Sequence, residues 1–174
     1  INYAIKNIHF PEDFKSYETA RRRFVFEELF VLQLALLIKS GEHTKNDAYI
    51  IGSDGKDSFI SRLPFKLTGA QLRTIDEIAA DMSSGKQMCR LVQGDVGSGK
   101  TIVAAAAAYL TIKSGHQAVI MAPTEILASQ HYDSMKKLFE PMGIRVVLLT
   151  GGVRAKEKRF IKEDISLGTA QLVI

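Results

Sequence analysis

Apolar residues follow a helical spacing in the region that begins at residue 68. In its first segment they recur every three or four positions, at Leu72, Ile75, Ile78, Ala79 and Met82. This spacing places them on one face of a helix. A glycine stands at the end of this segment and of three later ones, where it can stop a helix: Gly85, Gly115, Gly143 and Gly168. The pattern predicts four helices.

Short apolar runs follow the last three of these glycines. They cover residues 117–122, 144–149 and 170–174, and residues 89–93 read as a further short strand. Nearly continuous apolar runs are typical of parallel strands that are covered on both faces. Strand and helix alternate with a period of about thirty residues, the size of a β-α-β unit. We therefore predict an α/β domain with a parallel sheet over residues 63–174.

The first part of the chain has a different pattern. Residues 1–41 are predicted to be a linker segment with one long helix, which starts after a cap at Ser16 and ends at Gly41. Because apolar residues surround most of this helix, we expect it to be buried against another element. Residues 42–62 are polar and contain glycine, which predicts a flexible linker or a hairpin with short strands at 49–51 and 59–60.

Composition narrows the class of protein. Hydrophobic residues make up 46% of the chain and charged residues 24%, as in ordinary globular proteins. The net charge of +4 permits a nucleic-acid partner without requiring one. The single cysteine, Cys89, agrees with a reducing cytoplasm, and we expect it to be buried in its strand. The richest apolar stretch, residues 29–38, is too short to cross a membrane, so no membrane partner is expected.

Residues 94–101 fit the pattern G-x-x-x-x-G-K-[ST] of a phosphate-binding loop. The loop consists of Gly94, Asp95, Val96, Gly97, Ser98, Gly99, Lys100 and Thr101. Its glycines let backbone N–H groups turn toward an anion, and the next helix directs its positive end at the same point. Lys100 can reach the outer phosphates and Thr101 can bind Mg²⁺. The sequence therefore predicts a site for a nucleoside triphosphate and Mg²⁺.

Gln71 has two interpretations. Thr68 and Gln71 have the spacing of a capping box, in which both side chains bind the first turn of a helix. Alternatively, the Gln71 amide offers a donor and an acceptor to an adenine edge. Helicases of the large DExx superfamily carry a glutamine at this distance before the phosphate loop. The two roles are compatible.

Two further motifs follow predicted strands. Thr124 and Glu125 come after the strand at 117–122, and Thr150 and Gly151 come after the strand at 144–149. Thr124 can be a simple helix cap, and Gly151 can belong to a tight turn. Their shared place at the carboxyl ends of parallel strands instead favours a groove for a nucleic-acid backbone.

Together these motifs resemble the bacterial RecG family of branched-DNA helicases. The likeness rests on GDVGSGKT, on MAPTEILASQHY at 121–132, on LLTGG at 148–152 and on ARRRFVFEELFVLQLALL upstream. It implies a RecA-like lobe that binds ATP and Mg²⁺ and whose hydrolysis drives movement along duplex DNA at forks and four-way junctions. Lys100 would neutralise phosphate charge, Thr101 would hold Mg²⁺ and Gln71 would select adenine. Thr124, Glu125, Thr150 and Gly151 would form the DNA-facing rim.

Three other classes compete with this interpretation. Transcription-repair coupling factors have similar motifs, but they usually carry an aromatic residue at the place of Ser98 and lack the upstream helix. A phosphate-loop kinase or transporter-type ATPase would have an arginine lid or a Ser-Gly-Gly-Gln signature, and neither is present. A non-catalytic nucleotide-binding module is the third class, and binding without turnover would distinguish it.

The extent of the chain adds a last expectation. It starts without methionine and stops within the run 170–174, so we expect a segment of a larger protein. The Asp-Glu pair, the second lobe and the wedge implied by the resemblance are not in the sequence. We therefore expect weak nucleotide binding without turnover. We also expect a monomer whose exposed strand edge allows self-association.

Overall fold

The computed structural model describes residues 2–42 and 48–174. The chain divides into two compact units, Ile1–Lys45 and Asn46–Ile174. Residues 43–47, part of the predicted linker, lie outside the described residues. We describe each unit by itself.

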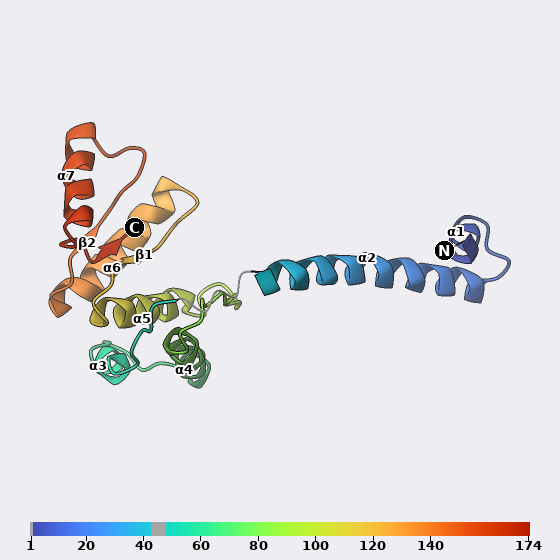
Figure 1. Cartoon of the computed structure of the whole chain (residues 1–174), viewed down its shortest axis with the longest axis horizontal. Coiled ribbons are helices and arrows are strands. Elements are labelled where there is room, and N and C mark those ends of the chain that lie inside the picture. Colours follow the sequence, from blue (N-terminus) through green and yellow to red (C-terminus); the bar gives the residue numbers. More distant parts are fainter. Residues whose placement is uncertain (1, 43–47) are drawn as a thin grey trace. The chain divides into compact units, whose positions relative to one another are not determined.

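The first unit consists of the helices α1 (Asn2–His9) and α2 (Phe14–Glu42), which pack together near the start of α2 (Figure 1). The backbone N–H of Ser16 donates to the Asp13 carboxylate at 2.6 Å. Asp13 therefore caps α2, and the prediction of a cap at Ser16 was wrong, since Ser16 lies inside the first turn. The helix also continues past the predicted stop at Gly41, since α2 ends at Glu42.

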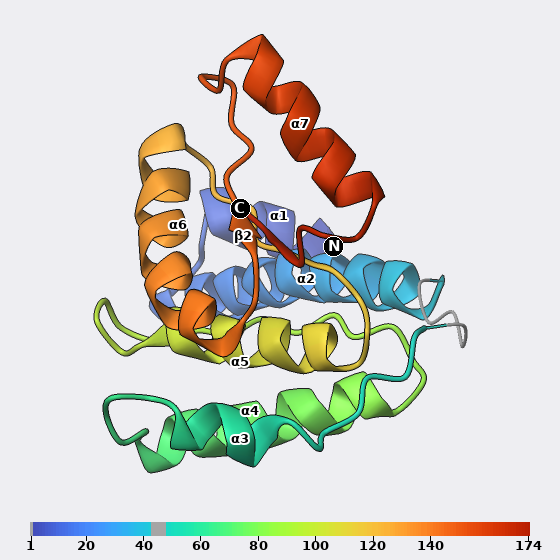
Figure 2. The same cartoon turned by 90° about the vertical axis from the view of Figure 1, so that its left-hand side faces the viewer.

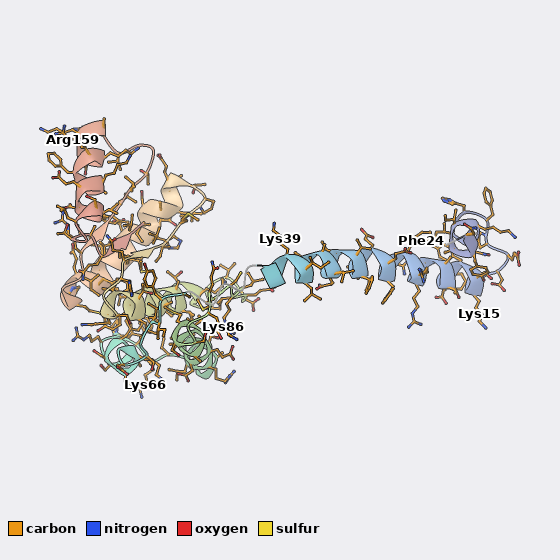
Figure 3. All side chains as sticks on the ribbon, in the orientation of Figure 1. Lys15, Phe24, Lys39, Lys66, Lys86 and Arg159 are labelled. Atoms are coloured by element: carbon orange, nitrogen blue, oxygen red, sulfur yellow. The ribbon has the colours of Figure 1, made fainter. Side chains whose placement is uncertain are left out.

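The apolar side chains of α2 are exposed in the structure. Figure 3 shows Phe24 among side chains that point away from the α2 ribbon, and Leu29, Leu32 and Leu37 are more than half exposed. The expected burial of this helix is therefore not found within the described part of its unit. Ala20, which is fully buried, is the exception. The reason is geometric: α1 reaches only the beginning of a helix of 29 residues.

The second unit contains the four predicted helices. Each is followed by a glycine with a positive φ, between 72° and 84°, which confirms the predicted stops. Such a backbone conformation strains residues with a side chain. The elements of this unit are α3 (Lys56–Ser61), α4 (Gly69–Ser83), α5 (Lys100–Lys113), β1 (Ala118–Val119), α6 (Glu125–Phe139), the 3₁₀ turn η1 (Glu140–Met142), β2 (Val146–Val147), α7 (Ala155–Ser166) and β3 (Leu172–Val173).

The three strands form a parallel sheet in the order β1-β3-β2, which confirms the predicted α/β class. Neighbouring residues of β3 face opposite sides of this sheet. Leu172 packs in the cluster that contains side chains of α5 and α6, whereas Val173 packs with Ile161 and Ile165 of α7. In Figures 1 and 2, α5 lies between the sheet and the pair α3–α4. The sheet is thus covered on both faces.

Three aromatic rings form the centre of the core. Phe59 of α3, Tyr109 of α5 and Phe139 of α6 are almost completely buried. Their ring centroids lie 5.2 to 6.4 Å apart, within the range of favourable aromatic pairs. This cluster joins three helices that are distant in sequence. It fixes α5, and with α5 the phosphate loop, relative to the rest of the unit.

Two parts of the second unit differ from the predicted strands. Residues 89–93 do not form a strand, since no neighbouring strand pairs with them within the described residues. Leu91 is 87% exposed, and Cys89 is exposed rather than buried. Residues 59–60 lie inside α3 instead of a hairpin. Residues 49–51 are not assigned to a strand, and the Ile51 N–H donates to the Met82 carbonyl at 3.0 Å.

Candidate nucleotide site

The phosphate loop has the backbone shape that its glycines predict. Gly97 and Gly99 have φ values of 82° and 80°, a conformation that other residues rarely adopt. The Ser98 N–H donates to the Asp95 carbonyl at 3.2 Å, which closes the loop into a turn. A Cβ on Gly94 would lie 2.9 Å from the Ser98 hydroxyl oxygen. The sequence of small residues is therefore what allows the loop to be this tight.

Lys100 and Thr101 stand in the first turn of α5, directly after the loop. The Lys100 ammonium donates to the carbonyl oxygens of Gly94 and Asp95, both at 2.7 Å. Its charge is therefore held over the loop, at the N-terminus of a helix whose first N–H groups have no partner within the helix. This arrangement combines a cation with a helix N-terminus, both of which attract an anion.

Gln71 forms the predicted capping box at the start of α4. Its side-chain oxygen accepts from the Thr68 N–H at 2.8 Å, and its own N–H donates to the Thr68 hydroxyl at 3.2 Å. Its Nε2 also donates to the carbonyl oxygen of Ser98 at 2.9 Å. Gln71 therefore binds the phosphate loop as well as the helix start. Adenine recognition by this amide stays a prediction.

A cavity of about 1040 Å³ lies beside the loop. Gln71, Gly99 and Thr101 line one part of it, and side chains of α6, including His131, line another. Arg62 and Phe65 also line the cavity; the sequence pattern did not single out Arg62, since a lone arginine in a polar stretch carries no signal. Phe65, which precedes the capping box, is 53% exposed.

The four residues predicted to face DNA come together at the carboxyl ends of the strands. Thr124, Glu125, Thr150 and Gly151 all line a cleft of about 360 Å³. Thr124 caps α6, because its hydroxyl accepts from the Leu127 N–H at 3.3 Å.

Glu125 fixes the loop that faces it across this cleft. Its Oε1 accepts from the Gly152 N–H at 2.7 Å. A Cβ on Gly151 would lie 2.7 Å from the same oxygen, so a larger residue there would require the Glu125 carboxylate to shift. The predicted rim therefore exists as one surface, and its binding role stays a prediction.

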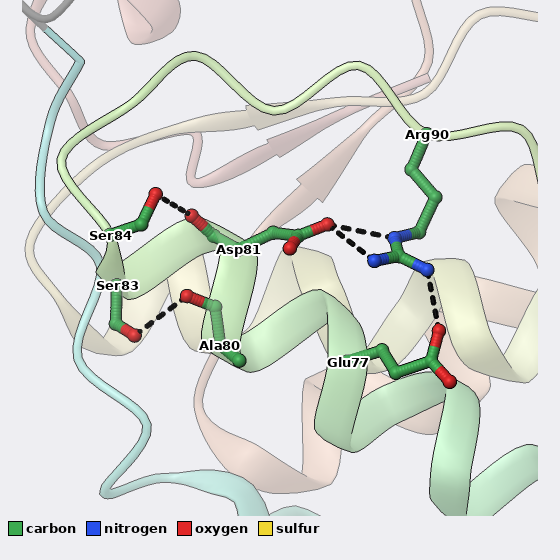
Figure 4. Close-up of polar contacts among 6 residues, drawn as sticks. All are labelled: Glu77, Ala80, Asp81, Ser83, Ser84 and Arg90. Carbon is green, nitrogen blue, oxygen red and sulfur yellow. Dashed lines mark hydrogen bonds and ion pairs between the residues drawn. The ribbon is translucent and has the colours of Figure 1, made fainter.

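Arg90 connects the extended segment before the loop to α4 (Figure 4). Its Nη1 lies 2.5 Å from Glu77, and its Nε and Nη2 lie 2.8 and 2.7 Å from Asp81. The hydrogen bond to Asp81, helped by the negative charges of both carboxylates, raises the pKa of Arg90 above its ordinary value. The sequence did not indicate this contact, because 13 residues separate Glu77 from Arg90.

Within residues 2–42 and 48–174, no group of three or more histidine, cysteine, aspartate or glutamate side chains is arranged to hold a metal ion. Over the same residues, no helix combines the length and apolar character needed to cross a membrane.

Comparison with known proteins identifies the family of the chain. The DEAD/DEAH box helicase family matches residues 68–174, the region from the capping box onward. The chain is 45% identical over 174 residues to the ATP-dependent DNA helicase RecG of Bacillus subtilis (strain 168), and 45% identical over 173 residues to that of Thermotoga maritima. Both alignments cover 98% of this chain, but only 26% and 22% of the two relatives.

A solved structure of RecG bound to a three-way DNA junction has a TM-score of 0.83 with this chain at 44% identity. The alignment covers 98% of this chain and 24% of that one. The predicted resemblance to the RecG helicases is therefore confirmed, and it extends over the α1–α2 unit as well as the α/β unit. The chain spans about a quarter of the length of the relatives it matches. Its matching region, its fold and its phosphate loop together show that the chain belongs to the DEAD/DEAH box helicase family.

Proposed function

We propose that this chain is the nucleotide-binding part of an ATP-dependent DNA helicase that remodels branched DNA. The observation that carries the proposal is the phosphate loop: Lys100 lies over a glycine-rich turn at the N-terminus of α5. The relatives reported above are named as ATP-dependent DNA helicases, which favours this function over a kinase or transporter ATPase. Since those relatives are RecG proteins, a transcription-repair coupling factor is also not favoured.

The residues present fit ATP with Mg²⁺. The positive φ values of Gly97 and Gly99 allow the backbone to curve around a phosphate, and the Lys100 ammonium supplies a compensating charge. Thr101, which lines the large cavity, would hold Mg²⁺ through its hydroxyl. Gln71 would select adenine with the amide hydrogen that its bond to Ser98 leaves free. Bound ATP would supply the free energy of hydrolysis to the motor.

We propose that the chain by itself binds nucleotide without turning it over. Among the described residues, those that line the cavity beside Thr101 include no carboxylate that could complete the metal shell or orient water. Phosphate release from ATP by the purified chain tests this point, with Lys100→Ala as the control for contaminating ATPases. No release above that control is expected. Sustained release that the substitution abolishes would contradict the proposal.

The DNA partner is proposed from the second cleft. Thr124 at the N-terminus of α6 and Thr150 after β2 offer hydroxyl and backbone N–H groups to a phosphate backbone. The relative of known structure is bound to a three-way DNA junction. We therefore expect this chain to bind a fluorescein-labelled three-way junction, measured by anisotropy. Absence of binding at low salt would oppose a DNA-facing role for this cleft.

Association and location are proposed on separate grounds. The N–H groups of Ala118 and Ile120 donate to β3, so β1 presents its other edge outward, and Val119 is 66% exposed. We propose a monomer that self-associates through this edge at high concentration. Light scattering over a concentration series tests this proposal. The Val119→Lys variant should remain monomeric, and equal association by the native chain and the variant would count against it.

A cytoplasmic location is proposed from the single cysteine.

A further inference from the structure

The segment that enters the phosphate loop is weakly held by its own backbone. Within the described residues, no backbone group of residues 87–94 takes part in a backbone–backbone hydrogen bond. Leu91 points into solvent, and Val92 is the residue of the segment that packs against the core. A segment with so few backbone bonds needs side-chain contacts to keep one conformation.

Arg90 supplies those contacts. Glu77 and Asp81 are four residues apart on α4, so their carboxylates lie on the same face of the helix. The planar guanidinium bridges both of them, at 2.5 Å to Glu77 and 2.7 Å to Asp81 (Figure 4). A fork of this kind fixes orientation as well as distance, which a lysine cannot do. Arg90 thus attaches the segment to α4 four positions before Gly94.

The same helix also contacts the far side of the loop. Gln71, in the first turn of α4, donates to the Ser98 carbonyl at 2.9 Å. One rigid helix therefore holds the loop at both ends, through Arg90 on the entry side and Gln71 on the exit side. Because α4 packs on α5, which begins at Lys100, these contacts also relate the entering segment to the lysine.

We propose that Arg90 is a positioning residue for the phosphate loop. Its ion pairs with Glu77 and Asp81 fix the entering segment and so keep the loop in its nucleotide-binding shape. The effect on nucleotide affinity rests on the function proposed above, whereas the effect on loop motion does not. Arg90 acts through the loop and has no contact of its own with a reacting group.

Loop motion can be measured directly with a spin label. Cys89 is the single cysteine, and Val96 in the loop is fully exposed, so a nitroxide on Val96→Cys in a Cys89→Ser chain reports loop mobility. In the absence of nucleotide, we expect Arg90→Gln to make the loop more mobile and so to narrow the nitroxide spectrum. The spectrum of Arg90→Lys should lie between those of Arg90→Gln and the parent chain. Arg145→Gln is the matched control, since it breaks an arginine–carboxylate pair with Asp164 on another part of the unit. An Arg90→Gln spectrum equal to the parent spectrum would overturn the proposal.

A second measurement tests the route through the carboxylates. In the unlabelled chain, Arg90→Gln should weaken binding of a fluorescent ATP analogue with Mg²⁺ about fivefold, a modest effect as expected for exposed ion pairs. The double variant Glu77→Gln/Asp81→Asn should weaken binding by a similar factor. Adding Arg90→Gln to that double variant should weaken binding no further. Additive losses would contradict action through these pairs. If the native chain binds no nucleotide, the proposed function fails, while the nitroxide spectra still decide the role of Arg90.

Discussion

The side-chain amide of Gln71 donates a hydrogen bond to the carbonyl oxygen of Ser98, with 2.9 Å between Nε2 and that oxygen. The two residues are 27 positions apart, and the bond links the capping box of α4 to the phosphate loop. The same amide oxygen accepts from the Thr68 N–H. A residue that could be interpreted as either a cap or a nucleotide ligand is thus also a support for the loop.

The closeness of Gln71 to Gly99 leads to the first prediction. A Cβ on Gly99 would lie 2.3 Å from the Gln71 Nε2, whereas a Cβ on Gly97 would meet nothing within 4 Å. Both glycines have positive φ, so alanine costs about 1–2 kcal/mol of backbone strain at either position. Gly99→Ala should therefore lower the thermal midpoint and the affinity for a fluorescent ATP analogue more than Gly97→Ala. Equal losses would mean that the contact with Gln71 is unimportant.

Gln71→Ala supplies the control for that comparison. Removing the amide removes the clash, so the extra penalty of Gly99→Ala over Gly97→Ala should disappear in the Gln71→Ala background. This is a double-mutant comparison, which isolates the interaction of the two positions. If Gly99→Ala still costs more than Gly97→Ala in the Gln71→Ala background, the cause of the extra loss lies elsewhere in the loop.

The aromatic cluster gives a prediction of stability. Phe139 is completely buried and packs against Phe59 and Tyr109, so Phe139→Ala should lower the free energy of unfolding by about 3–5 kcal/mol. Phe160 on α7 is 49% exposed and serves as a matched control, with a much smaller loss expected. Urea unfolding followed by circular dichroism measures both. Similar losses for the two variants would contradict the assignment of the core.

The cap of α2 predicts a dependence on pH. The hydrogen bond from the Ser16 N–H lowers the pKa of Asp13 below its ordinary value of 3.8. A lowered pKa in the folded state contributes stability above the unfolded value, and this contribution is lost as pH falls through the folded value. Exchange of the Ser16 amide hydrogen, followed by NMR, should therefore be slow relative to its intrinsic rate at pH above 3.8 and become less protected below it.

Asp13→Asn separates charge from capping in this experiment. Asparagine also caps helices, but it does not titrate in this range. In this variant the Ser16 amide should stay protected from exchange, and its protection should not change as the pH is lowered. If the native chain showed the same constant protection, the Asp13 carboxylate would not be the cap.

The second cleft predicts an effect on DNA binding. Thr150→Glu places a carboxylate in the cleft beside Thr124, where it would repel phosphates, so affinity for a labelled three-way junction should fall about tenfold. Ser83→Glu at the end of α4 is the control, because it changes net charge equally at a site outside this cleft. Equal losses for the two variants would show that only total charge matters.

Local signals predicted much of this fold. Glycines fixed the ends of four helices because a positive φ is a local property, and Thr68 with Gln71 predicted a cap that depends on residues three apart. The prediction of a strand at 89–93 was wrong. A strand requires a neighbouring strand to pair with, and the sequence of the segment alone does not show whether one is present. The cap of α2 was misplaced because Asp13 and Ser16 are both good caps and stand close together.

The same distinction between local and distant contacts holds for the candidate site. The phosphate loop and the rim residues could be proposed from the sequence because each lies in a contiguous motif. Arg62, His131 and the link from Arg90 to Glu77 could not be proposed in this way, since they depend on how the ends of α3, α4 and α6 are placed around the loop. Contacts between distant segments leave no local pattern.

The most direct test of the account is a calorimetric titration of Mg-ATP and Mg-ADP into the chain and into Lys100→Ala. The Lys100 ammonium lies over the loop, 2.7 Å from two of its carbonyl oxygens, so its removal should abolish binding while leaving the circular dichroism spectrum unchanged. We predict weak binding by the native chain and none by the variant. Equal binding by both, or no binding by the native chain, would contradict the claim that residues 94–101 form a working nucleotide site.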